Sequence, residues 1–401
     1  MNQYQKWILT GLFASSVSLL CADQPSAKPM TSGAKPAQSN DKKPMSQNDI
    51  TPPAGPLVDA GARFVMTADF IYWQMKQDNM AYSISNGGGA VLTFPSTTTR
   101  AVTITNNEKV GKLDFDYQPG FKVGAGIISD HDNWDLFAQY TWLRQHASGH
   151  QSTGRTDTIP NSDFFGEEKD YGTWTSHFNN IDLELGRSFF ISRRLVLRPH
   201  IGLKGAWINQ KFNTTNNHQG VNVAVNDSIS NLIATLTDSN SSVLFGITDF
   251  KTRQSQRFWG VGLRAGLNTS WHFTRDWSIY GNMVASELSC RFKDKVTIKG
   301  TIQHPPSAPE GGSNDAGSSA LTATTDSKSR NAFHIMRPVL EMALGLRYEM
   351  MFSDDNYQFF MQAGWEQQIW LDHNQFLVTQ GTSNAGELTM QGLDVKFGLA
   401  F

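Results

Sequence analysis

The sequence predicts an all-β fold, a transmembrane antiparallel up-and-down β-barrel of about ten strands. Three observations lead to this fold class. Apolar and polar residues alternate over runs of about 14 to 20 residues, whereas a typical soluble strand has roughly 5 or 6 and a strand that crosses a bilayer needs roughly 9 to 11. The connections between the runs alternate between short and long, and aromatic residues gather near both ends of the runs.

Composition agrees with a barrel. Charged residues make up 17% of the 401 residues, below the roughly 25% of soluble domains. Mean hydropathy is −0.38, and no second apolar run long enough for a helical span follows the N-terminal one. Strands with one lipid face and one lumen face average to such a polar value. The formal charge of −2 gives no reason to expect nucleic acid as a partner.

The N-terminal residues predict export. Lys6 supplies a positive start, residues 7–20 are mostly apolar, and Ala22 offers a small residue for cleavage. We therefore expect a cleaved signal peptide over residues 1–22. The alternative, a lipoprotein acylated at Cys21, is disfavoured because the residue before this cysteine is a large leucine.

Residues 23–60 predict a disordered periplasmic leader. They are rich in Pro, Ser and Lys and nearly free of large apolar side chains, so they cannot bury enough surface to offset the entropy of ordering. The barrel is then expected over residues 61–401. After cleavage Cys290 is the single cysteine, which cannot close an internal disulfide, and we expect a thiol half-buried on a strand.

Ten strands are predicted from period-two alternation. In the run 113–128, Phe121, Val123 and Ile127 lie opposite Lys122 and Gly124. A hairpin within residues 91–105 would raise the count to twelve. The predicted strands cover residues 63–78, 113–128, 134–146, 173–190, 193–212, 257–274, 277–292, 333–352, 357–373 and 388–401.

The connections predict the topology. Short periplasmic turns and long outer loops are typical of bacterial outer-membrane barrels, as is an even strand count. The short connections contain turn formers and cover residues 129–133, 191–192, 275–276 and 353–356. The long ones are rich in Gly, Ser, Thr and Asn and cover residues 79–112, 147–172, 213–256, 293–332 and 374–387. We therefore expect the protein in the bacterial outer membrane.

Tryptophans near the strand ends predict two aromatic belts at the lipid headgroups; the alternative is a scatter of core aromatics. The expected belt residues are Trp134, Trp142, Trp174, Trp207, Trp259, Trp277 and Trp370. In the last strand Phe397, Leu399 and the C-terminal Phe401 look like the signal by which the barrel-assembly machinery recognises its clients.

Charged residues opposite the lipid-facing sets are expected to line the lumen. Charges are tolerated there because the lumen is wet, whereas on the lipid face they cost about 2–4 kcal/mol near the midplane. The turn at 191–192 brings Asp182 or Glu184 close to Lys204, which predicts an ion pair across the ladder. The expected lumen charges are Lys122, Asp182, Glu184, Arg198, Lys204, Arg264, Glu341 and Arg347.

Three functions fit these features. The first is a porin-like pore that passes small hydrophilic solutes or ions, and the alternative is a surface adhesin or structural coat protein that acts through the long loops. The third, an outer-membrane hydrolase, is disfavoured. The sequence has no nucleophilic serine motif, metal-spaced histidine pair or phosphate loop, and Asp372 and His373 are neighbours that point to opposite faces of a strand. We expect no enzymatic activity, no cofactor and no metal.

Two stretches resemble the major outer-membrane-protein-like porins of chlamydia-related and legionella-type bacteria. One is residues 68–74 (ADFIYWQ), and the other is residues 119–126 (PGFKVGAG) leading into residues 134–136 (WDL). The resemblance is one of layout across residues 63–401 plus these motifs, and it implies a pore-forming surface protein of a Gram-negative envelope. Two departures are the single cysteine, where the chlamydial proteins are cysteine-rich, and the ten strands, where general porins have about 16. The expected partners are outer-membrane lipids, lipopolysaccharide and the barrel-assembly machinery, with a homotrimer by analogy with porins.

Overall fold

The computed structural model describes residues 62–86, 108–129, 134–159, 162–218, 247–304, 321–352, 357–376 and 385–401. All of them lie in one compact unit, residues 47–401. The predicted signal peptide, the leader and the extra hairpin within residues 91–105 fall outside the described residues. Within the described ranges, no helix is long and apolar enough to cross a membrane.

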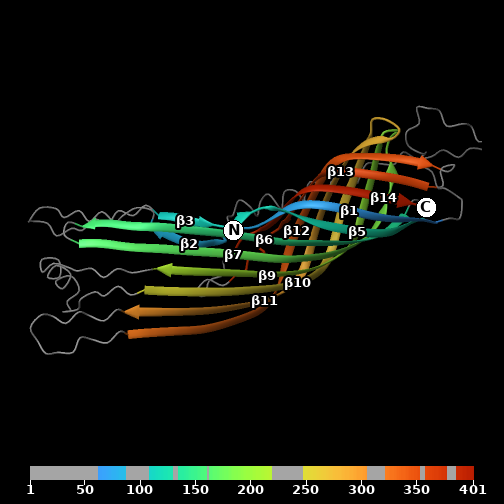
Figure 1. Cartoon of the computed structure of the whole chain (residues 1–401). Coiled ribbons are helices and arrows are strands. Elements are labelled where there is room, and N and C mark those ends of the chain that lie inside the picture. Colours follow the sequence, from blue (N-terminus) through green and yellow to red (C-terminus); the bar gives the residue numbers. More distant parts are fainter. Residues whose placement is uncertain are drawn as a thin grey trace, which may run out of the picture. The chain divides into compact units, whose positions relative to one another are not determined.

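Ten long antiparallel strands of the described chain close into a barrel (Figure 1). Each pairs with the next long strand along the chain, and β1 pairs with β14 to close the sheet. The predicted up-and-down barrel of ten strands is confirmed. The strands are β1 (Ala62–Gln77), β5 (Tyr117–Ser129), β6 (Trp134–Ile159), β7 (Ser162–Arg187), β9 (Leu195–His218), β10 (Ile247–His272), β11 (Trp277–His304), β12 (Leu321–Phe352), β13 (Tyr357–Trp370) and β14 (Leu388–Ala400).

Shorter strands accompany the barrel. β4 (Asp114–Phe115) pairs with β6, and β8 (Phe189–Phe190) pairs with β9. β2 (Ala81–Asn86) and β3 (Glu108–Lys112) form a separate two-stranded sheet. The sequence predicted a loop over residues 79–112 with a possible hairpin within residues 91–105, whereas the two described strands flank that stretch.

Several strands run further than predicted at their long-loop ends. β6 and β7 pair from Trp134 and Arg187 to Ile159 and Ser162, so the predicted loop 147–172 is almost entirely strand. β9 to β12 likewise extend into the predicted loops 213–256 and 293–332. The physical reason is that the described outward side chains of these extensions are mostly polar, as Arg253 and Lys293 are, so the apolar–polar alternation ends before the strand does.

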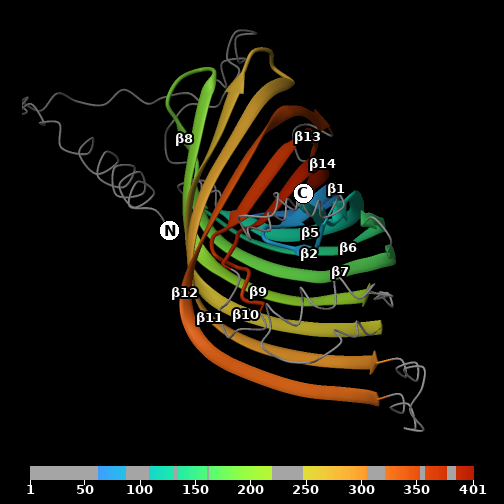
Figure 2. The same ribbon diagram turned by 90° about the vertical axis from the view of Figure 1, so that its left-hand side faces the viewer.

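An apolar band on the outward face marks the part of the barrel that crosses the membrane. On β1 it runs from Phe64 to Tyr72, which are 50% and 45% exposed, and this is about the length needed to cross a bilayer. Beyond Tyr72 the next outward residue is Gln74, and beyond Trp259 on β10 it is Arg257. The band therefore occupies the short-turn half of the long strands, and Figure 2 shows β9, β10 and β11 continuing side by side.

Glycines on the inward face leave room for charged side chains. Gly202 is the register partner of Arg264, and Gly262 is the register partner of Lys204. A Cβ atom would lie 1.8 Å from a backbone carbonyl oxygen at Gly202 and 1.9 Å from one at Gly262. Neither position accepts a side chain without a backbone shift, as is usual where strands approach closely.

Candidate functional site in the barrel lumen

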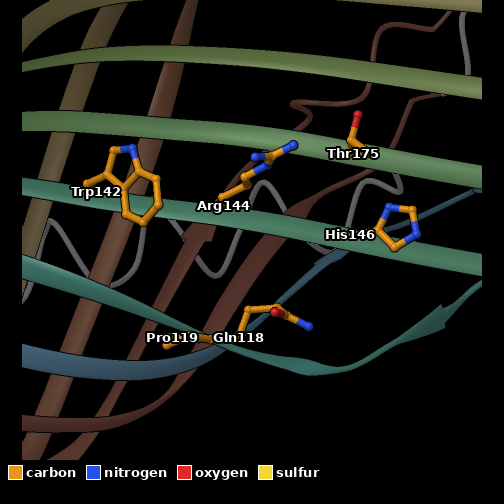
Figure 3. A pocket seen from close by; sticks show the side chains of 6 residues that line it. All are labelled: Gln118, Pro119, Trp142, Arg144, His146 and Thr175. Carbon is orange, nitrogen blue, oxygen red and sulfur yellow. The ribbon is translucent and has the colours of Figure 1, made fainter.

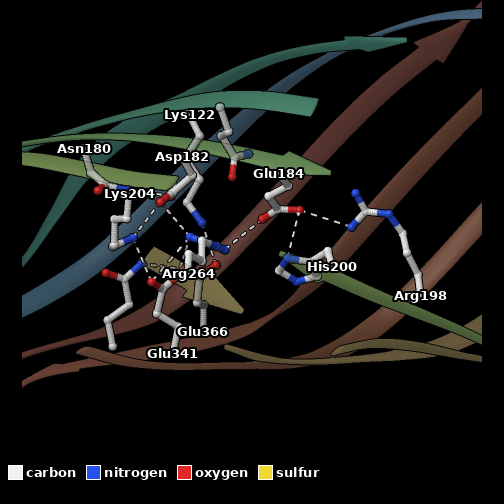
Figure 4. Close-up of polar contacts among 12 residues, drawn as sticks. Lys122, Asn180, Asp182, Glu184, Arg198, His200, Lys204, Arg264, Glu341 and Glu366 are labelled. Atoms are coloured by element: carbon white, nitrogen blue, oxygen red, sulfur yellow. Dashed lines mark hydrogen bonds and ion pairs between the residues drawn. The ribbon is translucent and has the colours of Figure 1, made fainter. Parts of the chain in front are cut away.

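A group of charged side chains from several strands meets inside the barrel and is linked by ion pairs (Figure 4). Asp182 and Lys204 are next to the outward Leu183 and Leu203, so the group lies at the level of the apolar band. Its members come from five strands that are far apart in the sequence but neighbours or near neighbours around the barrel. We call them the main ionic cluster: Asp135 on β6, Asp182 and Glu184 on β7, Arg198 and Lys204 on β9, Arg264 on β10, and Glu341 on β12.

Lys204 and Arg264 are the centre of this cluster. Lys204 Nζ lies 2.8 Å from Asp182 Oδ1 and 2.7 Å from Glu341 Oε1. Arg264 Nη1 lies 2.7 Å from Asp182 Oδ1 and 3.3 Å from Glu341 Oε2, and its Nη2 lies 2.9 Å from Glu184 Oε1. Since β10 and β11 separate Lys204 from Glu341, this pair spans part of the lumen rather than only joining adjacent strands.

Arg198 extends the main ionic cluster towards the short turns. Its Nη1 lies 3.1 Å from Glu184 Oε2, and its Nε and Nη2 donate to the two carboxylate oxygens of Asp135. Such two-point guanidinium–carboxylate contacts fix geometry as well as charge. His200 Nδ1 lies 3.7 Å from the same Glu184 oxygen.

A second ionic cluster lies on the opposite strands. Lys122 Nζ on β5 is 2.5 Å from Glu366 Oε2 on β13 and 2.7 Å from Asp394 Oδ2 on β14. The same ammonium lies 4.6 Å from the centre of the Trp73 ring. Because β1 and β14 separate β5 from β13, the Lys122–Glu366 pair also crosses part of the lumen.

The eight expected lumen charges all lie on the inward face. Seven belong to the two clusters, and the ion pair predicted across the hairpin is present between Asp182 and Lys204, which are register partners. Arg347 is separate: it pairs with Glu349 near the short turns and lies 4.3 Å from the Phe360 ring centre. The sequence reasoning missed Asp135, although its position next to the outward Leu136 on an alternating strand indicates an inward side chain.

An apolar layer fills the lumen on the long-loop side of the main ionic cluster. Phe178 precedes Asp182 on β7, and Ile208 follows Lys204 on β9, each by one step of four residues towards the long loops. Phe258 and Phe178 both meet the ring of Trp370 edge-on, at 5.9 and 5.7 Å between ring centres. The layer consists of Trp73, Leu143, Trp174, Phe178, Ile208, Phe258, Leu288, Phe292 and Trp370, all buried.

The segment that follows β13 turns into the lumen and completes this layer. The four residues from His373 to Phe376 are buried. Gln256 of β10 holds the segment at two points: its Nε2 donates to the His373 carbonyl at 3.0 Å, and its Oε1 accepts from the Gln375 backbone N–H at 3.0 Å. The His373 ring packs against Phe258 with 4.7 Å between ring centres. Burial lowers the pKa of His373, which lies beyond the membrane-spanning strands, to about 3, so the ring is neutral.

The family of the chain follows from comparison with known proteins. Residues 59–401 match the family model described as Legionella pneumophila major outer membrane protein precursor. The chain belongs to this family. The resemblance drawn from residues 68–74 and 119–126 is thereby confirmed, and the family together with the barrel places the protein in the bacterial outer membrane.

No curated protein matches the chain. Among solved structures, the outer membrane protease OmpT from Escherichia coli is 12% identical, with 85% of this chain and 96% of that chain covered and a TM-score of 0.31. The Pseudomonas putida toluene transporter TodX is 7% identical, with 85% and 89% covered and a TM-score of 0.19. A Pseudomonas aeruginosa FadL homologue is 8% identical, with 86% and 90% covered and a TM-score of 0.24.

The tryptophans of this outer membrane protein divide between its two faces. Trp134, Trp207, Trp259 and Trp277 point outward and are 41–46% exposed, and Trp142 is an outward, half-buried residue stacked on Phe121. The expectation that Trp174 and Trp370 belong to the belts is wrong, because both are buried in the apolar layer. The sequence alone could have shown that Trp174 points inward. Trp174 and Asp182 are an even number of residues apart on one strand, and such side chains point to the same face.

The expected assembly residues lie on the outward face of β14 and at the residue that follows it. Phe397, Leu399 and Phe401 are 45%, 40% and 44% exposed. Phe401 exchanges two backbone hydrogen bonds with Phe64, at 2.7 and 2.9 Å, where the last strand meets the first. The residues expected to be recognised therefore also form the seam that closes the barrel.

A shallow groove of about 360 Å³ lies on the outer wall where β5, β6 and β7 leave the apolar band (Figure 3). Trp142 lies at its membrane end, and Arg144 and His146 continue the same outward row of β6. Its remaining lining residues are Gln118, Pro119 and Thr175. The groove offers a mixed aromatic and basic surface at headgroup level.

Proposed function

We propose that this outer membrane protein is a porin-like pore for small hydrophilic solutes or ions, and that the structure corresponds to its closed state. The observation that carries the proposal is the contrast between the two faces of the membrane-spanning strands. The outward face is mostly apolar, with Glu287 of β11 as an exposed exception, while the inward face carries two ionic clusters contributed by β5, β6, β7, β9, β10, β12, β13 and β14. Lys396 of β14 also pairs with Asp69 of β1 at 3.3 Å. Inward charged side chains on most strands of the barrel suit a wet path better than a packed structural core.

Closure in this proposal has two parts. The apolar layer excludes water, and an apolar constriction gates a channel by dewetting. The main ionic cluster adds a charged barrier, in which Arg264 contacts three carboxylates and Lys204 contacts two. A cation with several partners can exchange one for another without being left unpaired, so this barrier can rearrange at low cost.

Single-channel recording in planar bilayers tests the proposal. The wild type should show rare openings, and Trp370→Ala should open more often because it removes the ring on which Phe178 and Phe258 pack. Trp207→Ala is the matched control, since Trp207 faces outward. Arg264→Glu should shift ion selectivity towards cations. If none of these variants conducts above the level of the empty bilayer, the pore proposal fails.

A surface adhesin or structural coat protein is the second candidate. It is favoured by the closure of the described lumen and by the length of β6, β7 and β9 to β12, which project beyond the apolar band. This reading predicts no conductance for wild type or Trp370→Ala, together with normal surface assembly of both. Neither candidate involves a catalytic step.

A further inference from the structure

A basic surface covers the outer wall of β9 to β12 above the apolar band. Its members share the outward face of their strands and are exposed, apart from the half-buried Arg291. We define the basic surface as Lys211 on β9, Arg253 and Arg257 on β10, Arg291, Lys293 and Lys295 on β11, and Arg330 on β12.

The register places like charges side by side on this surface. Arg257 lies directly opposite Lys293, and Lys295 lies directly opposite Arg330. Like charges in such positions destabilise a sheet, so the arrangement costs stability in the isolated barrel. A surface kept at this cost is best explained by an anionic partner that offsets the repulsion.

The rows of the basic surface contain no acidic side chain. Its rows contain Asn209, Asn213, Ser255 and Thr297 besides the basic residues. Neighbouring lysines outside the surface are paired instead: Lys251 with Asp249 at 3.2 Å, and Lys299 and Lys328 with Asp326 at 3.8 and 3.6 Å. Two of these lysines share Asp326, and Lys328 lies in the register row of Arg253, so the surplus of positive charge is greatest in the rows from Arg257 to Arg253 and smaller beyond them.

The position of the basic surface selects the partner. Trp207 and Trp259 are register partners in the outer belt, and the same row continues across the sheet as Arg291 and His334. The charges thus begin where the belt meets the headgroups. Four residues along β10 separate Arg257 from Arg253, about 13 Å of extended strand. This depth matches a headgroup layer that carries phosphates and sugar carboxylates at several heights.

We propose that the basic surface binds the phosphorylated headgroups of lipopolysaccharide in the outer leaflet, with the phosphates placed between the facing pairs Arg257–Lys293 and Lys295–Arg330. Arginine and lysine suit phosphate oxygens through charge-assisted hydrogen bonds. The groove at Arg144 and His146 has fewer charges and serves as a comparison site. The inference does not depend on whether the barrel conducts.

Binding and stability of the full mature chain test this inference. The variant Lys293→Gln/Lys295→Gln/Arg330→Gln removes three charges from the basic surface, and the control Lys76→Gln/Lys112→Gln/Arg144→Gln removes three exposed charges elsewhere. Each protein is reconstituted in phosphatidylcholine vesicles with and without purified lipopolysaccharide, and affinity and unfolding temperature are measured. Each basic residue near an anionic leaflet increases the binding affinity by roughly a factor of five. The first variant lacks three such residues, so it should bind lipopolysaccharide on the order of a hundredfold more weakly.

The difference in unfolding temperature between the first variant and wild type should have opposite signs in the two lipid conditions. In phosphatidylcholine alone, the first variant should unfold at the same temperature as wild type or a higher one, because the facing repulsion is relieved. With lipopolysaccharide, wild type and the control should be stabilised and the first variant should not. Binding of lipopolysaccharide by the first variant within twofold of wild type would overturn the inference. So would binding of soluble heparin fragments by wild type with no binding of lipopolysaccharide, which would assign the surface to a soluble polyanion.

Discussion

Removing Lys204 isolates the energetic role of the main ionic cluster. Lys204 has no exposed surface and bridges Asp182 and Glu341 at 2.8 and 2.7 Å, while those carboxylates keep side-chain exposures of only 6% and 8%. The substitution Lys204→Met retains most of the side-chain volume. It leaves four carboxylates with two cations, whereas the wild-type cluster has three cations. Water cannot readily replace the ammonium at a site this closed.

The expected loss is set by the partners left behind. Breaking a buried ion pair by removing one member costs about 3–5 kcal/mol, because the other member remains buried and uncompensated. Arg264 still contacts both carboxylates, at 2.7 and 3.3 Å, so we expect Lys204→Met to lower the free energy of unfolding by about 3 kcal/mol, the lower end of that range.

The assay is equilibrium unfolding by urea in lipid vesicles, followed by tryptophan fluorescence. Lys76→Met is the matched control: Lys76 lies exposed on the outward face of β1, and its loss should change stability by less than about 0.5 kcal/mol. Adding Glu341→Gln to Lys204→Met should recover about 1–2 kcal/mol, the coupling expected of residues in contact. A loss below about 1 kcal/mol for Lys204→Met, or no recovery in the double variant, would refute the reasoning.

Three further predictions follow from other parts of the barrel. Burial raises the pKa of Asp294, beyond the apolar band on β11, to about 7; because the folded state then holds its proton more tightly than the unfolded chain, its contribution to stability is complete below about pH 4 and is lost as the pH rises through 7. Asp294→Asn should remove this part of the pH dependence, measured by unfolding between pH 4 and 8, and an unchanged profile would contradict the assignment. Trp174→Ala should lower the free energy of unfolding by about 3–5 kcal/mol, more than Trp259→Ala, where lipid replaces the lost contacts; equal losses would place both rings on one face. Phe401→Asp should reduce barrel assembly in cells while refolding in detergent continues, as read from heat-dependent gel mobility, and equal loss in both settings would point to the β1–β14 seam instead of recognition.

The lumen charges show how much of the candidate site the period-two alternation of the sequence could predict. Parity along a strand assigns each side chain to a face, and this was enough to place Lys204 and Arg264 inside the barrel. The turn at residues 191–192 fixed the register of β7 and β9, so the Asp182–Lys204 pair could be predicted as well. Local turn geometry sets which residues face each other on neighbouring strands.

Contacts across the lumen could not be predicted in the same way. Glu341 is more than a hundred residues from Lys204, and Glu366 is 244 residues from Lys122. Their meeting depends on the closure of the sheet and on the stagger of ten strands, and no local pattern encodes either. The inward turn of the segment from His373 to Phe376 is likewise set by Gln256 on a distant strand.

The sequence by itself determined the barrel, its ten long strands and the face of most side chains. The reason is that each strand has lipid on one side and water or protein on the other. This imposes an alternation with a period of two residues, which can be recognised without knowing the tertiary structure. Only the tertiary structure decided that the inward tryptophans form an apolar layer and that the charges neutralise one another across the lumen. Above the membrane the described outward side chains of β6, β7 and β9 to β12 are mostly polar. There the sequence no longer alternates between an apolar outward and a polar inward residue. Strand length and register therefore depend on pairing with the neighbouring strands.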